Sequence, residues 1–332
     1  MINLTQSRIM QNWDMDNADT PLVSVRCITY NHEPYIAQAL DGFLMQKTNF
    51  PFEVIVHDDA STDRTAEIIR EYEARFPKII KPIYETENQY SKHDGSLGRI
   101  MEAACKGKYI ALCEGDDYWI DENKLQMQAD FLEGNPEYTL CFSNAKIWKN
   151  NDFVCDSFPC LLQDRDVKTE EIILNGGLFI PTATIIYRNE IKNTYPGFCS
   201  KCWVGDYPLQ IYASICGKVW GMSNVMSVYR ASVPGSWTQR TRNLPWLAKR
   251  KGVESELRML NGINELTSFT YNFPILKRKI SFLRKNVWKE IPLVLSGKWY
   301  NTFLFMAILI VKISRRVLKK IFPFRLTKVI ED

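Results

Sequence analysis

The chain has 332 residues, 45% of them hydrophobic and 12% aromatic, which suits one large α/β domain with an appendage, or two domains. The formal net charge is only +4, but residues 245–332 contain 18 Lys and Arg against 6 Asp and Glu, so the preceding part is acidic. A basic segment on an acidic body indicates an anionic partner, either a membrane surface or a nucleic acid. The N-terminus carries Asp14, Asp16 and Asp19 and lacks an apolar stretch, so we expect no signal peptide.

The nine cysteines are an odd number, and most lie in apolar, strand-like runs. Cys27, Cys105, Cys113, Cys141 and Cys216 are therefore expected to be small buried side chains in a reducing compartment. Cys199 and Cys202 have zinc-like spacing, but no second pair of cysteines or histidines accompanies them. The pattern therefore predicts no zinc site.

Residues 22–145 alternate between short apolar runs and amphipathic segments, which predicts an alternation of strands and helices. Strands are expected at 22–29, 52–57, 79–84 and 109–113, and helices at 34–45, 61–76 and 95–106. This repeat favours an α/β fold with an open, mostly parallel sheet and helices on both faces. Ligands of such sheets bind where the strands end, near the switch in strand order.

From residue 138 to about 244 the pattern is less regular. We expect strands at 138–148, 181–187 and within 218–230, and a helix that starts at Gly205 and runs to Ile215. Residues 149–169 are predicted to be a polar loop, and residues 232–244 a mobile loop. This half has no internal repeat and no low-complexity tract.

Polar clusters follow the predicted strands of the first half, at the point where each strand ends. They are Thr29-Tyr30-Asn31-His32, His57 to Asp63, Asn88, and the acidic run Glu114-Gly115-Asp116-Asp117. Adjacent acids repel each other, and they persist most easily when a cation neutralises them. Mg²⁺ and Mn²⁺ typically join one or two carboxylates to substrate phosphates. Because no G-x-G-x-x-G or Walker lysine loop is present, a dinucleotide oxidoreductase or a P-loop enzyme is disfavoured.

In this order, the clusters resemble those of the family-2 inverting glycosyltransferases of the GT-A fold, a Rossmann-like fold, of the type found in bacterial surface-polysaccharide assembly. The resemblance covers residues 22 to about 240. Its matching pieces are Thr29-Tyr30-Asn31, Asp58-Asp59-Ala60-Ser61-Thr62-Asp63-Arg64-Thr65, Glu114-Gly115-Asp116-Asp117-Tyr118-Trp119 and Gly205-Asp206-Tyr207-Pro208-Leu209.

The resemblance implies a role for each matching residue. Thr29, Tyr30 and Asn31 would form the first loop around the donor's base, and Asp59 would bind the uracil ring or its equivalent. Asp116 and Asp117 would hold Mn²⁺ or Mg²⁺ and the diphosphate of a UDP-linked sugar, with either of them as the direct ligand and Glu114 less so. Arg99 resembles the family's basic residue near the donor, and Asp206 its general base.

An inverting transfer needs a base that takes the proton of the attacking hydroxyl, and a cation that stabilises the leaving diphosphate. The position of Asp206 at a helix start favours its ionised form, although an aspartate there can equally be a plain N-cap. Arg230, at the end of the predicted strand 218–230, and Trp237, on the predicted mobile loop that follows, are candidates to close over the diphosphate. The alternatives are a nucleotidyltransferase, which the lack of a Gly-rich loop after the first strand disfavours, and a non-catalytic nucleotide-sugar-binding protein.

The predicted basic, helical C-terminal region, 245–332, contains an apolar run at 303–311, about half of what a membrane-spanning helix needs. With Trp288, Trp299 and Tyr300 before it and Lys and Arg around it, this run suits the surface of an anionic membrane. A helix packed on the catalytic domain is the alternative, and nucleic acid is disfavoured because no binding motif accompanies the charge. We therefore expect three parts: an N-terminal extension (1–21), a catalytic domain (22–244) and this basic C-terminal region. The catalytic domain would have a nucleotide-sugar-binding half, 22–145, and an acceptor half, 146–244. The expected location is peripheral, on the cytoplasmic face of the inner membrane, and the expected acceptor is a glycan or a lipid-linked saccharide.

Overall fold

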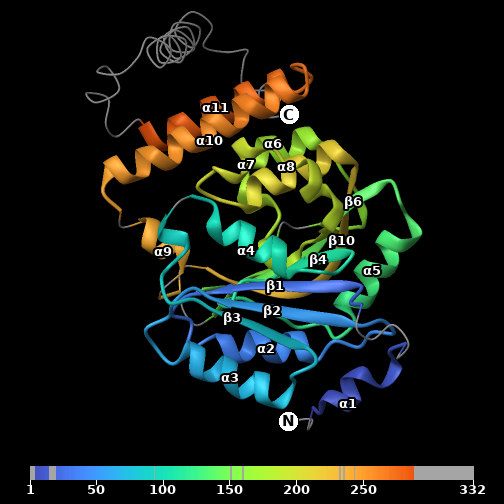
Figure 1. Ribbon diagram of the computed structural model, residues 1–332. Coiled ribbons are helices and arrows are strands. Elements are labelled where there is room, and N and C mark those ends of the chain that lie inside the picture. Colours follow the sequence, from blue (N-terminus) through green and yellow to red (C-terminus); the bar gives the residue numbers. More distant parts are fainter. Residues whose placement is uncertain are drawn as a thin grey trace, which may run out of the picture. The chain divides into compact units, whose positions relative to one another are not determined.

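The computed structural model describes residues 4–14, 20–92, 94–149, 152–158, 161–231, 233–234, 236–242 and 244–287 (Figure 1). The chain divides into two compact units, residues 1–274 and 275–332. The first unit contains the sheet and all the predicted site residues. The predicted domain limits at 22 and 244 remain a proposal.

A ten-stranded sheet forms the centre of the first unit, with eight strands in the order β3-β2-β1-β4-β9-β6-β10-β5. Strands β1, β2, β3 and β4 are mutually parallel, and β6 is parallel to β10. Because β9 is antiparallel to both β4 and β6, these six strands all run in one direction, which confirms the predicted mostly parallel sheet. The bounds are β1 Val23–Thr29, β2 Phe52–Asp58, β3 Ile80–Tyr84, β4 Tyr109–Leu112, β5 Tyr118–Trp119, β6 Tyr138–Lys149, β9 Ile186–Arg188 and β10 Lys218–Arg230.

The parallel half of the sheet is covered on both faces. Helices α2 (Ile36–Leu44) and α3 (Thr65–Arg75) lie on one face, and α4 (Ser96–Ala104) and α8 (Asp206–Cys216) lie on the other (Figure 1). Every residue of β2 is buried, as expected for a strand between two helical layers. The predicted alternation of strands and helices is therefore confirmed.

The N-terminal segment packs into the same core. Helix α1 (Gln6–Ile9) and the 3₁₀ turn η1 (Met10–Asn12) place Ile9, Met10 and Trp13 among the buried side chains. The Trp13 ring meets Phe52 edge-on at 5.3 Å, and its Nε1 donates to Thr48 Oγ1 at 3.0 Å. The described part of the predicted extension is thus part of the domain core.

Three predicted loops and strands differ from the structure. Residues 149–169 contain strands β7 (Asp152–Phe158) and β8 (Arg165–Val167), which pair with β6 and β10. The predicted strand 181–187 begins as a 3₁₀ turn, η5 (Thr182–Thr184), and the predicted loop 232–244 contains helix α9 (Trp237–Arg242). Cys216 is exposed, because it is the last residue of α8 rather than part of a strand. The other four cysteines predicted to be buried are buried.

The remaining elements lie outside these layers, and α11 falls mostly in the second unit. They are η3 (Tyr90–Lys92), α5 (Lys124–Gly134), α6 (Thr169–Asn175), η4 (Gly177–Phe179), η6 (Asn189–Thr194), α7 (Gly197–Ser200), α10 (Trp246–Leu266) and α11 (Asn272–Val287). Helix α10 belongs to the first unit and packs closely on the α7 segment: a Cβ on Gly262 would lie 2.6 Å from the Phe198 ring. The apolar run 303–311 lies outside the described residues. Within the described range, no helix has the length and apolar character to cross a bilayer.

Candidate active site

The acidic run lies in a tight turn between two strands. Glu114-Gly115-Asp116-Asp117 follows β4, and the next two residues form β5, which pairs antiparallel with Ser227 and Val228 of β10. At Gly115 a Cβ would lie only 2.8 Å from Thr29 Oγ1 and 3.0 Å from His32 Nδ1. The absence of a side chain at Gly115 therefore lets the acidic turn pack against the loop that follows β1.

Asp116 and Asp117 have different surroundings. The Asp117 residue is only 4% exposed, and its Oδ1 accepts a hydrogen bond from the backbone N–H of Arg230 at 2.7 Å. Burial, with the neighbouring charge of Asp116, raises the pKa of Asp117 well above its ordinary value. The Asp116 side chain is 16% exposed, and its Oδ2 lies 4.0 Å from His32 Nε2. Asp117 is thus fixed in the protein, whereas Asp116 is the more accessible carboxylate.

Arg230 braces the acidic turn. Its Nη1 donates to the carbonyl of Asp116 at 2.6 Å, and its Nη2 donates to Gln38 Oε1. The guanidinium lies over the Tyr118 ring at 4.3 Å and over the Tyr35 ring at 5.2 Å. Arg230 is the last residue of β10, which agrees with the predicted strand, and its side chain is buried and held on several sides. Closure of this residue over a diphosphate stays a prediction. The side chain of Trp237 lies outside the described residues.

The first two loops of the predicted donor site are joined through Asn31. Its Oδ1 accepts a bond from the Thr62 N–H at 2.8 Å, and its own N–H donates to Ser61 Oγ at 2.9 Å. Asn31 and Ala60 both have positive φ angles, 55° and 61°. Asparagine tolerates this backbone region better than most residues, which accounts for its presence at the tip of the turn.

Asp59 joins the second loop to the third. Its two carboxylate oxygens accept bonds from the backbone N–H groups of Gln89 (2.6 Å) and Tyr90 (3.1 Å). The carbonyl of Asp59 accepts a further bond from Asn88 Nδ2 at 3.1 Å. Asp59 is almost completely buried, so the structure assigns it a positioning role in addition to any contact with a ligand. The loops after β1, β2 and β3 are therefore held together at the C-terminal ends of these strands.

Asp206 is the first residue of α8. Its Oδ1 accepts a bond from the N–H of Tyr207 at 2.8 Å, and its Oδ2 accepts one from Thr182 Oγ1 at 3.4 Å. Burial raises its pKa, and the bonds to Tyr207 and Thr182 act in the opposite direction. Gly177 lies beside the carboxylate, because a Cβ there would be 3.6 Å from Oδ1.

The turn η5, which carries Thr182, is tied to the acidic motif. The carbonyl of Ala183 accepts bonds from Trp119 Nε1 at 2.8 Å and from Ser227 Oγ at 2.9 Å. The next carbonyl, of Thr184, accepts a bond from Gln128 Nε2 at 3.0 Å. The strand that follows the acids and the turn that contacts Asp206 are therefore parts of one buried hydrogen-bonded network.

The acidic motif and Asp206 lie within electrostatic reach of each other, although they are far apart in sequence. Burial is the largest cause that raises the pKa of Glu114 to about 8; the charges of Asp116 and Asp206 contribute in the same direction, and Arg26 opposes them. Burial also raises the pKa of Tyr229, with the same two aspartates contributing. Together with the hydrogen bonds that tie η5 to β5 and to Asp206, these effects indicate that the acidic motif and Asp206 lie in the same part of the fold.

Two arginines of the helices α4 and α9 are relevant to the proposed donor site. Arg99 lies on α4 with its side chain 65% exposed, and its Nη1 donates to the carbonyl of Asp94 at 2.9 Å. Arg240, on α9, was not predicted: its guanidinium lies 5.5 Å from the centre of the Tyr30 ring. The pKa of His32 is lowered, first by burial and partly by the charge of Arg240. The charge of Arg240 therefore lies near the loop after β1, although the sequence of α9 predicts a loop and not a helix.

The carboxylates of this site can hold a divalent cation only if a substrate supplies further ligands. Among the residues that the structure describes, no group of three His, Cys, Asp or Glu side chains is arranged to hold a metal ion. Asp116 and the buried Asp117 provide two carboxylates, which is the number that Mg²⁺ or Mn²⁺ commonly takes from a protein when substrate phosphates supply other ligands. The residues present therefore fit a cation that binds together with a diphosphate.

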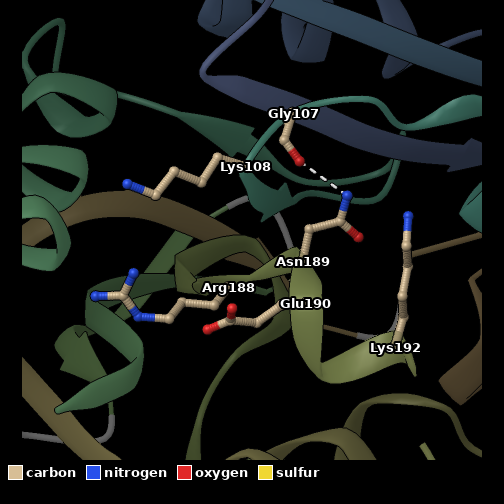
Figure 2. Close-up of a pocket in the computed structure, with 6 residues that line it drawn as sticks. All are labelled: Gly107, Lys108, Arg188, Asn189, Glu190 and Lys192. Carbon is tan, nitrogen blue, oxygen red and sulfur yellow. Dashed lines mark hydrogen bonds between the residues drawn. The ribbon is translucent and has the colours of Figure 1, made fainter. Parts of the chain in front are cut away.

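A pocket of about 230 Å³ lies at the N-terminal ends of the parallel strands, away from the acidic turn (Figure 2). Gly107 and Lys108 precede β4, and the Asn189 amide donates to the Gly107 carbonyl at 2.8 Å. Arg188 also lines this pocket, but its guanidinium donates to the carbonyls of Tyr138 and Leu132 and to the hydroxyl of Tyr109. We interpret Arg188 as a structural residue of this edge.

A protein-family model described as glycosyl transferase family 2 matches residues 24–203, which include the first loops and the acidic motif. An uncharacterized protein of Mycobacterium tuberculosis is 35% identical over 237 residues, which cover 71% of this chain and 66% of that protein. The chain thus spans just under two thirds of this relative. The Escherichia coli protein WfaP, named as a UDP-Glc:alpha-D-GlcNAc-diphosphoundecaprenol beta-1,3-glucosyltransferase, is 32% identical over 40% of this chain and 49% of its own length.

Solved structures match the fold over most of the chain. S. aureus TarS (residues 1–349) in complex with UDP-GlcNAc has a TM-score of 0.62 at 20% identity, covering 86% of this chain and 79% of TarS. The mannosyltransferase PcManGT from Pyrobaculum calidifontis, in complex with GDP-Man and Mn²⁺, has a TM-score of 0.51 at 15% identity, covering 93% of this chain and 87% of its own. At these identities the matches show a common fold.

Proposed function

The chain belongs to glycosyl transferase family 2, and from this premise we propose that it is a metal-dependent, inverting transferase of sugars from a nucleotide-sugar donor. It is a glycosyltransferase with the GT-A fold. The observation that best supports the finer proposal is a hydrogen-bonded link between the two predicted parts of the site. Thr182 contacts the Asp206 carboxylate, and the carbonyl of the next residue, Ala183, accepts a bond from Trp119, which follows Asp117 by two residues.

Asp116 and Asp117 would hold Mn²⁺ or Mg²⁺, which stabilises the charge on the departing nucleoside diphosphate. A nearby cation favours the ionised form of a carboxylate, so it would offset the raised pKa of Asp117. Asp206 would accept the proton of the acceptor hydroxyl, and its raised pKa brings it closer to the value that suits a base near neutral pH. Thr29, Tyr30, Asn31, Asp59 and Arg99 remain the proposed donor-binding residues.

For the donor we propose a UDP-linked sugar, and for the acceptor a glycan or a lipid-linked saccharide. TarS binds UDP-GlcNAc, and the name of WfaP specifies UDP-Glc and a diphosphoundecaprenol-linked acceptor. A lipid-linked acceptor agrees with the basic C-terminal region, which would place the enzyme on the cytoplasmic face of a membrane. This proposal links the chain to bacterial surface-polysaccharide synthesis.

Three measurements test this proposal. Nucleotide release is assayed with UDP- and GDP-sugars, in Mn²⁺ and in excess EDTA. Binding of UDP is measured by titration, and the anomeric configuration of the product is determined. Asp206→Asn should retain Mn²⁺-dependent UDP binding and lose transfer about 10²–10⁴-fold, the usual contribution of a general base. Asp116→Ala should lose the metal-dependent part of UDP binding. Asp130→Asn, on α5 and bonded to Gln126, is a matched control that should change neither.

Near-normal turnover in the Asp206→Asn variant would refute the assignment of the base. Tight Mn²⁺-dependent UDP binding by a variant that lacks both Asp116 and Asp117 would refute the metal site. A product that retains the donor's anomeric configuration would refute inversion and leave the family assignment intact.

A further inference from the structure

The turn between α10 and α11 exposes three large apolar side chains within eight residues of sequence. Leu266 is 49% exposed, Phe269 61% and Phe273 66%, and all three belong to the first unit. Single exposed apolar residues are common, but three of them within eight residues at one turn indicate a surface for interaction.

The backbone of this turn is strained where it presents the first phenylalanine. Ser268 and Phe269 have φ angles of 48° and 63°, in the left-handed region that helix ends normally give to glycine or asparagine. A residue with a Cβ is disfavoured there, because the Cβ crowds the backbone. The turn is nevertheless well bonded: the Phe269 N–H donates to the Asn264 carbonyl at 2.8 Å, and Asn264 Nδ2 donates to Asn272 Oδ1 at 3.0 Å. An ordered but strained turn therefore holds an aromatic side chain toward solvent, where it gains little from folding.

The sequence that follows this turn is basic. Residues 266–289 contain no Asp or Glu, although the exposed Glu265 directly precedes them, and their cations are Lys277, Arg278, Lys279, Arg284, Lys285 and Lys289. Aromatic side chains in a segment followed by cations suit the headgroup layer of an anionic bilayer, to which Lys and Arg near the surface are attracted.

We propose that the turn of residues 266–273 docks the protein on an anionic membrane surface by inserting Leu266, Phe269 and Phe273 among the lipid headgroups. This contact involves a different segment from the apolar run 303–311 and does not depend on the glycosyl-transfer reaction. If the acceptor is lipid-linked, as proposed above, this contact would bring the first unit itself to the membrane that carries the acceptor.

The test is co-sedimentation of the full chain with vesicles of phosphatidylcholine alone and of phosphatidylcholine with phosphatidylglycerol. Phe269→Gly should weaken binding to the anionic vesicles at least threefold, and adding Phe273→Ser should weaken it at least tenfold. Because glycine adopts the left-handed conformation without strain, Phe269→Gly should keep or raise the melting temperature. Lower binding by this variant then cannot arise from unfolding.

Leu162→Ser removes a side chain that is 96% exposed elsewhere on the first unit, and it should leave vesicle binding unchanged. Nucleotide release should be the same in the two Phe variants and the parent chain, which separates a failure of this proposal from a failure of the proposed function. Parent-like binding by the double Phe variant would overturn the proposal. Absence of binding by the parent chain to anionic vesicles would overturn it too, and would favour a protein partner for the turn.

Discussion

Thr182 is expected to set the pH at which the proposed base works. Burial raises the pKa of Asp206, and the hydroxyl of Thr182, 3.4 Å from Oδ2, acts against this by stabilising the ionised form. A base must be ionised to accept a proton, so activity should fall as the pH drops through its pKa. Thr182→Val removes the hydroxyl at nearly constant volume, and it should therefore move the acid limb of the pH–rate profile to higher pH.

The size of this movement follows from the geometry. A hydrogen bond to a charged group is worth about 1.5–3 kcal/mol, and at 3.4 Å we take about 1 kcal/mol. Since one pH unit corresponds to 1.36 kcal/mol, the limb should move by about 0.7 pH units. The rate below the midpoint should fall about fivefold, while the rate on the plateau stays close to that of the parent chain.

The measurement is kcat/KM for transfer across the acid limb at saturating Mn²⁺, for the parent chain and for Thr182→Val. Thr194→Val is the matched control, because the Thr194 hydroxyl donates to the Ile191 carbonyl at the same distance of 3.4 Å but lies on η6. We expect no movement of the limb in the control. A lower plateau with an unchanged limb in Thr182→Val would mean that Thr182 has only a structural role, and it would refute the reasoning.

Two further predictions concern tightly packed positions. At Gly115→Ala the new Cβ would lie 2.8 Å from Thr29 Oγ1 and 3.0 Å from His32 Nδ1, so we expect a loss of about 1–3 kcal/mol in thermal or denaturant unfolding and weaker metal-dependent UDP binding. Gly98→Ala, in α4 with open space around it, should instead gain about 0.5–1 kcal/mol, and equal effects at the two glycines would contradict this account. Burial lowers the pKa of Lys124 to about 8 from 10.5, so the parent chain should gain about 3 kcal/mol of stability between pH 8 and 10.5 relative to Lys124→Met. Urea unfolding of both proteins at the two pH values measures this gain, and a pH-independent difference would exclude it.

The parallel half of the sheet could be predicted because its signals are local. Each strand there is a short apolar run that ends in a polar turn, and the predicted strand 52–57 differs from β2 by a single residue, Asp58. Parallel strands that are linked by helices end at one edge, so the polar clusters after β1, β2 and β4 could be assigned to a common site before the structure was available.

Elements stabilised by distant partners could not be predicted in this way. Strand β5 is only two residues long, too short for any periodicity, and it exists because it pairs with β10 more than a hundred residues later. The run Thr182-Ala183-Thr184 reads as the start of a strand because of its β-branched residues. It forms a 3₁₀ turn instead, in which the Thr184 hydroxyl donates to the carbonyl of Pro181 at 2.7 Å.

The sequence also cannot tell a positioning residue from a ligand-binding one. Asn31 and Asp59 are proposed donor contacts. In the structure the Asn31 carboxamide joins the loops after β1 and β2, and the Asp59 carboxylate joins the loops after β2 and β3. Asn and Asp are suited to both roles, so residue type alone does not separate them. Arg240 was missed for a related reason: its relation to Tyr30 depends on helix α9, which lies in a segment with strong loop signals.

The two adjacent aspartates show how the fold divides a role that the sequence leaves open. The antiparallel pairing of Tyr118 with Val228 brings the end of β10 beside the acidic turn, where Arg230 lies. From this position Arg230 binds the turn twice, with its N–H on the carboxylate of Asp117 and its guanidinium on the carbonyl of Asp116. Asp117 is thereby committed to the protein, and the Asp116 carboxylate is left as the more exposed of the two. Because Arg230 makes both bonds from within the protein, the acidic turn is held by the fold itself, and a cation that binds Asp116 would not have to order it first.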